Sequence, residues 1–138
     1  MTTQIRERTS QLASAGSYNG GIVRDVATLA TSDATATKIY GIPVALLESV
    51  AFRVLIVGMK TDATASYAST VVGGARRQAA GNVTSAGSAT IVTIEDSAGS
   101  PVATVNANTS TQEMEIKIAG VAAENWRFEA CVEYIKLV

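Results

Sequence analysis

Residues 113–118 read EMEIKI, with a charged side chain at each odd position and Met or Ile at each even one. Successive side chains of a β-strand point to opposite faces, so Met114, Ile116 and Ile118 are expected on a buried face while the charged residues meet water. Residues 126–134 show the same alternation. Their apolar face holds Trp126, Phe128, Ala130, Val132 and Tyr134. The sequence therefore predicts antiparallel strands, each covering a core with one face.

A third stretch, residues 51–59, is apolar at both odd and even positions except at Arg53. One face should join the core through Phe52, Val54 and Ile56, which predicts a central strand whose outer face is covered as well. Two explanations are open for that cover. It is either a second subunit, or an arm or loop of the same chain.

Runs of β-branched residues, separated by small polar and glycine-containing stretches, continue from residue 22 to the end of the sequence. This spacing is typical of an all-β fold, and we predict an antiparallel β-sandwich or jelly-roll-like domain over residues 22–138. The expected strands are 22–29, 38–43, 50–60, 67–78, 89–95, 102–106, 113–121 and 126–138. We expect the last two of these strands to pair through a turn at residues 122–125.

Residues 1–21 are polar, rich in Ser, Thr and Gly, and without sustained periodicity. They predict an extended N-terminal arm that ends at a turn or hinge of Asn and Gly residues. One interpretation is a frayed terminus. The other is an arm that orders on a neighbouring subunit, with Ile5 and Leu12 as apolar anchors. The contact residues expected in the arm are Ile5, Arg6, Arg8, Leu12 and Tyr18.

The 138-residue chain has a formal net charge of −1, which gives no long-range attraction to phosphate. We therefore expect neither nucleic acid nor an anionic membrane as a partner. The longest apolar stretch, around residues 54–57, is far shorter than the ~20 residues that span a bilayer. The N-terminus lacks the apolar run of a secretory signal, so we expect it to be retained.

The single cysteine, Cys131, cannot form an intrachain disulfide, and a reducing site of synthesis is expected. Its neighbours Ala130 and Val132 indicate a small side chain near the core. The alternation instead assigns Cys131 to the face that carries Arg127 and Glu129.

The sequence offers few residues that are suited to catalysis. There is no histidine, and one cysteine cannot build a structural zinc site, so we expect no metal, no cofactor and no enzymatic activity. Paired carboxylates could in principle act as a glycosidase does. The acids at 113, 115, 129 and 133 alternate with core positions, which favours solvated strand faces. Arg53, Arg76 and Arg77 are candidate contacts to an acidic partner, with a solvated strand face as the alternative.

The C-terminal part carries a resemblance to a known group of proteins. Residues 116–121 (IKIAGV), 125–130 (NWRFEA) and a closing strand at Tyr134-Ile135 resemble the hairpin that ends small tailed-bacteriophage structural proteins. Residues 54–77, a long strand and loop followed by a tyrosine and an arginine pair, are similar to the same group.

The resemblance implies a virion protein, made in the host cytoplasm, that is either a head decoration (cement) protein or a tail-fibre or spike module. The first would be a homo-oligomer, expected as a trimer, that binds the major capsid protein on the head surface and reaches onto the shell with residues 1–21. The second would bind a host surface receptor through the loops at 61–66 and 106–112. A small hydrolase that uses acids alone is the third hypothesis. The chain has no heptad shaft or fibrous repeat, which argues against an independent fibre.

Overall fold

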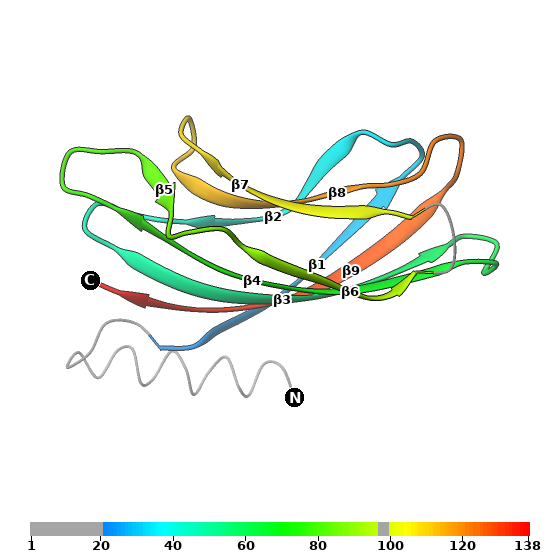
Figure 1. Ribbon diagram of the computed structural model, residues 1–138, viewed down its shortest axis with the longest axis horizontal. Coiled ribbons are helices and arrows are strands. Elements are labelled where there is room, and N and C mark those ends of the chain that lie inside the picture. The colour runs from blue at the N-terminus through cyan, green and yellow to red at the C-terminus, as the bar shows by residue number, and fades with distance from the viewer. Residues whose placement is uncertain (1–20, 97–99) are drawn as a thin grey trace.

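A computed structural model describes residues 21–96 and 100–138, and in these residues nine strands form two antiparallel sheets (Figure 1). The strands are β1 (Val23–Thr31), β2 (Ala36–Pro43), β3 (Ser49–Lys60), β4 (Ser66–Arg77), β5 (Val83–Ser85), β6 (Thr90–Asp96), β7 (Val102–Asn108), β8 (Glu113–Ala119) and β9 (Trp126–Leu137). The predicted antiparallel β-sandwich is confirmed. The arm predicted at residues 1–21 lies outside the described residues except for Gly21.

The two sheets differ in size. The larger has the order β1-β9-β3-β4, and the far edge of β4 then pairs with β5 at one end and β6 at the other. The smaller has the order β2-β8-β7. Figure 1 shows the smaller sheet lying across one face of the larger sheet. The opposite face of the larger sheet is its outer face.

The core fills the space between the sheets. From the larger sheet, Trp126 stacks on Phe128 with ring centroids 5.9 Å apart, and Tyr67 meets Phe128 edge-on at 6.4 Å. The smaller sheet contributes the even positions of β8, as the EMEIKI alternation predicts. Of the residues expected in the core, Tyr134 is half-buried. The others are buried: Phe52, Val54, Ile56, Met114, Ile116, Ile118, Trp126, Phe128 and Val132.

All eight predicted strands are present, and one strand and one pairing differ from expectation. The three-residue strand β5 was not predicted, because a run this short has too few residues to show alternation. The expected pairing of the last two strands is wrong: β8 lies in the smaller sheet and β9 in the larger, so the turn at 122–125 crosses between sheets. Alternation shows that a strand covers the core, but not from which side.

Gly58 in β3 is required by the aromatic cluster. A Cβ atom there would lie 2.5 Å from Cε1 of Phe128, whose ring occupies that space. We predict that Gly58→Ala lowers the free energy of unfolding by about 1–3 kcal/mol, because Phe128 must leave its contacts with Trp126 and Tyr67. Urea denaturation measures this. The control is Gly81→Ala, where the nearest atom is 3.8 Å away, and equal stability of the two variants would contradict the prediction.

Candidate functional site

The outer side of β3 is apolar and exposed. In this strand the even positions from Val50 to Gly58 are buried and all the odd positions are exposed, so Leu55 and Val57 point away from the core and are 53% and 54% exposed. β3 is nevertheless a central strand, paired with β9 on one side and β4 on the other. A central strand with large apolar side chains left in water indicates a surface that a partner covers.

The neighbouring strands extend this surface. The register places Val26, Cys131, Leu55, Thr70 and Val92 in one row across β1, β9, β3, β4 and β6. We call the outward-pointing, exposed apolar side chains of these strands the apolar face. It comprises Val26, Leu55, Val57, Met59, Val72, Val92, Ile135 and Leu137. These five strands have 7 to 12 residues each. With strands about 4.8 Å apart and about 3.3 Å per residue, the whole outer side of the sheet, polar positions included, spans roughly 800 Å², close to one side of a standard protein interface.

A charged cluster lies within the apolar face. Glu133 of β9 is paired in register with Arg24 of β1 and with Arg53 of β3. The Arg24 Nε donates to Glu133 Oε2 at 2.5 Å, and the Arg53 Nη2 donates to Oε1 at 2.6 Å. The hydrogen bond from Arg24 is the largest cause that lowers the pKa of Glu133, the bond from Arg53 adds to it, and burial opposes both.

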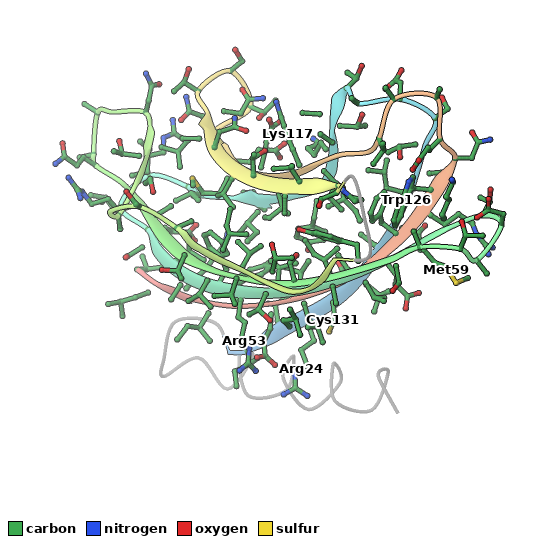
Figure 2. The ribbon with its side chains drawn as sticks, turned by 45° about the vertical axis from the view of Figure 1, so that its right-hand side comes forward. Arg24, Arg53, Met59, Lys117, Trp126 and Cys131 are labelled. Atoms are coloured by element: carbon green, nitrogen blue, oxygen red, sulfur yellow. The ribbon has the colours of Figure 1, made fainter. Side chains whose placement is uncertain are left out.

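Figure 2 shows Arg24, Arg53 and Cys131 projecting from the larger sheet on the side away from the smaller sheet. Cys131 is exposed. The position predicted from alternation is therefore confirmed, and the position near the core that Ala130 and Val132 indicated is wrong. The thiol lies between Val26 and Leu55 in the register.

The outer face of the smaller sheet is polar instead. Lys38 Nζ donates to Glu113 at 2.7 Å, Lys117 lies 3.4 Å from Glu115, and Asn108 Nδ2 donates to Glu115 at 2.8 Å. The side chain of Glu115 is only 8% exposed, so the expected solvated carboxylate is wrong at this position. The hydrogen bond from Asn108 is the main cause that lowers the pKa of Glu115, which burial opposes. A general acid needs a raised pKa, so this carboxyl is unsuited to that role.

The other predicted contact residues are placed as follows. Ile5, Arg6, Arg8, Leu12 and Tyr18 lie outside the described residues. Arg53 lies in the charged cluster, between the residues of the apolar face. Arg76 is exposed on the outer side of β4, four residues along from the position that pairs with Arg53. Arg77 is partly buried and donates from Nε to the Gly81 carbonyl at 2.9 Å, so it fixes a loop and is not a free cation.

The two loops expected to bind a receptor lie at opposite ends of the sandwich. The loop at 61–66 follows Lys60 at the end of β3, and the Thr61 amide donates to the Asn125 carbonyl. The loop at 106–112 lies near the start of β3, since the Val44 amide donates to the Gln112 carbonyl. Twelve residues of β3 separate these ends by about 36 Å. The structure therefore does not bring the two loops into one site.

Sequence reasoning identified the exposed side of β3 but missed Val26, Val72 and Val92. Each occupies the outward phase of its own strand, so alternation could have assigned it to a face. The strand order that gathers these residues beside Leu55 has no signal in a single sequence.

Residues 21–96 and 100–138 hold no group of three or more acidic or cysteine side chains arranged to bind a metal ion. The same ranges include no helix long and apolar enough to cross a membrane.

Comparisons with known proteins give only weak structural similarity. No family model matches, and no curated protein matches. The tailspike protein of Acinetobacter baumannii bacteriophage Fri1, a capsular polysaccharide depolymerase, has a TM-score of 0.46 and 8% identity over 85% of this chain and 19% of its own. The tailspike of Acinetobacter baumannii phage AM24 has a TM-score of 0.43 and 11% identity, covering 81% and 26%. A Bacillus endospore appendage protein, from a family of disulfide-linked pili, has a TM-score of 0.30 and 16% identity, covering 89% and 93%.

The chain spans about a fifth to a quarter of these two tailspike chains. At these TM-scores the backbones diverge over much of their course, so the matches do not define a function for this chain.

The lowered pKa values of Glu115 and Glu133 predict that the stability of the fold depends on pH. Their pKa values are lowered from 4.5 in the folded state, so they stabilise the fold above about pH 4.5 and lose this contribution as the pH falls below it. We expect the urea midpoint to drop between about pH 4.5 and pH 3. Glu115→Gln and Glu133→Gln should each lower the midpoint at pH 7 and flatten its pH dependence.

Glu129→Gln, an exposed carboxylate on the same strand as Glu133, is the control for the loss of one negative charge. Denaturation curves at several pH values make the comparison. A Glu133→Gln curve with the wild-type pH slope would contradict the assignment.

Proposed function

We propose that this chain is a non-enzymatic structural module of a tailed-phage virion that acts by assembly and belongs to the tail. The observation that carries the proposal is the apolar face, a set of exposed large apolar side chains on the outer side of a six-stranded sheet. The sequence resemblance to tailed-phage structural proteins supplies the virion setting.

The physical support is the cost of leaving this surface in water. Burying apolar area gains about 25 cal/mol per Å², and the outer side of the larger sheet, on which the apolar face lies, is about as large as one side of a standard interface. Obligate complexes, whose subunits do not persist apart, have interfaces that are more apolar than transient ones. A chain with this surface suits a structure that stays assembled.

The same consideration favours the tail over the head. A protein that joins a finished shell must first persist in solution, where a large uncovered apolar surface is unfavourable. A tail component is built into a permanent complex, where subunits cover one another during assembly. The tailspike proteins compared above are tail components too, but the proposal rests on the apolar face.

The proposed partner is first a second copy of the chain, as a homo-oligomer, and then other virion proteins. Receptor binding is not part of the leading proposal, because the two loops that would form the site lie at opposite ends of the molecule.

A charge placed in the apolar face tests the assembly surface. We expect Leu55→Asp to weaken self-association about a hundredfold, because burying an unpaired carboxylate costs about 3 kcal/mol or more. The subunit itself should still fold, since Leu55 is about half exposed. Sedimentation velocity over a concentration series measures the change. Thr104→Asp, on the outer face of the smaller sheet, is the matched control, and equal behaviour of both variants would refute the surface.

Location is tested by gold-labelled antibody on virions seen by electron microscopy. Label on the tail is the expected result. Label spread over heads would replace the tail assignment with head decoration, and particles without label would overturn the virion proposal.

A further inference from the structure

We infer that the apolar face of one copy is covered by one end of a second copy, the end that carries the loops between β1 and β2 and between β3 and β4. We call residues 32–35 and 61–65 at this end the loop end. The contact is head-to-tail, with Asp33 and Asp62 of one copy beside Arg53 of the next. The inference rests on the proposed self-association and names the surface of the second copy that takes part in it.

The two loops of the loop end have similar sequences and the same local structure. Residues 33–37 read DATAT and residues 62–66 read DATAS. In each loop the aspartate carboxylate accepts a hydrogen bond from the amide of the threonine two residues later, at 2.8 Å for Asp33 and at 3.0 Å for Asp62. Both aspartates are exposed. The loop end therefore presents two carboxylates in matching turns.

The register places these two carboxylates on either side of β9. Thr31 at the end of β1 and Lys60 at the end of β3 both pair with Trp126. Asp33 and Asp62 each follow two residues beyond that row. Their strands are two strand spacings apart, which is about 10 Å.

The arginines of the charged cluster have the same lateral spacing. Arg24 in β1 and Arg53 in β3 both pair with Glu133 of β9, so their backbones are also about 10 Å apart. Two carboxylates and two guanidinium groups carried on the same pair of strands can therefore face one another between copies.

Within one subunit the sheet keeps these groups apart. Seven residue steps of β3, about 23 Å, separate Arg53 from Lys60, where the next loop begins. Figure 2 shows Arg53 on the outer side of the sheet, well away from Met59 and Trp126 at the loop end. Because β3 is paired on both sides, it cannot bend to bring its own loop back onto Arg53. Only a second copy can place the loop end there.

Charge and shape both favour the loop end as the cover. The Arg53 side chain is 64% exposed, and a partner that covers it must supply an acceptor to offset the loss of water. The loop end supplies carboxylates, and its exposed Ala34 and Ala63 are small enough to lie against the aliphatic side chains. A contact between two different surfaces is heterologous, so it repeats from copy to copy into a ring or a filament.

Mixing two variants, each defective in one surface, tests this arrangement. Leu55→Asp damages the apolar face, and Asp33→Arg combined with Asp62→Arg damages the loop end. We expect each variant alone to associate about a hundredfold more weakly than the wild type, because an unpaired or like charge then meets the contact. The equimolar mixture should form a 1:1 dimer that grows no further, since one intact face meets one intact loop end. Sedimentation velocity measures both results.

The control for added positive charge is Ser110→Arg combined with Thr111→Arg, two exposed positions at the opposite end of the sandwich. It should associate as the wild type does. Circular dichroism checks that each variant folds. Should the charge reversal unfold the chain, Asp33→Asn with Asp62→Asn keeps an acceptor in each turn and should weaken association about tenfold.

The outcomes separate this inference from the proposed function. A folded loop-end variant that associates as strongly as the wild type overturns the head-to-tail contact and leaves self-association intact, as a face-to-face pair of sheets would. A mixture that stays monomeric, although each variant is folded, also overturns the head-to-tail contact. A wild type that is monomeric at every concentration overturns the self-association itself.

Discussion

The other elements of the molecule depend on the pairing of β3 with both β9 and β4. This strand has 12 residues, and nearly all of them are paired on both sides. Side chains alternate with a period of two, so a slip of one residue would exchange the core side chains for the outer ones along the strand. The register that sets Gly58 against Phe128 also sets Leu55 beside Cys131 and Thr70. Core and apolar face are therefore fixed by the same hydrogen-bond ladder.

The sequence predicts what depends on neighbours along the chain and misses what depends on neighbours in space. EMEIKI predicts β8 and its buried face, and the two-sided apolar pattern of residues 51–59 predicts a central strand with an outer face in need of cover. The sheet to which each strand belongs is not encoded in alternation, and so the pairing of β8 with β9 was wrong. For the same reason Glu115 was expected in water, while Lys117 from its own strand and Asn108 from β7 enclose it.

The two outer faces of the sandwich have opposite chemistry. On the smaller sheet, lysine, glutamate and asparagine side chains satisfy one another's charges and hydrogen bonds. Such a face is stable in water and gains little from a partner. On the larger sheet, large aliphatic side chains from five strands are exposed on the outer side. This asymmetry makes the molecule directional, with one side suited to solvent and the other to burial in an assembly.

The charged cluster of Arg24, Glu133 and Arg53 links three strands and restricts which partner can bind the apolar face. Glu133 joins β1, β9 and β3 through its two arginine partners, and this network resists sliding between strands. It also limits which partner can bind. Aliphatic contact alone would allow any apolar surface to bind. A partner that covered Arg53 without a polar group to replace its water would bind more weakly, because removing a charge from water costs free energy. The apolar face thus supplies affinity, and the charged cluster restricts the shape and position of the partner that covers the sheet.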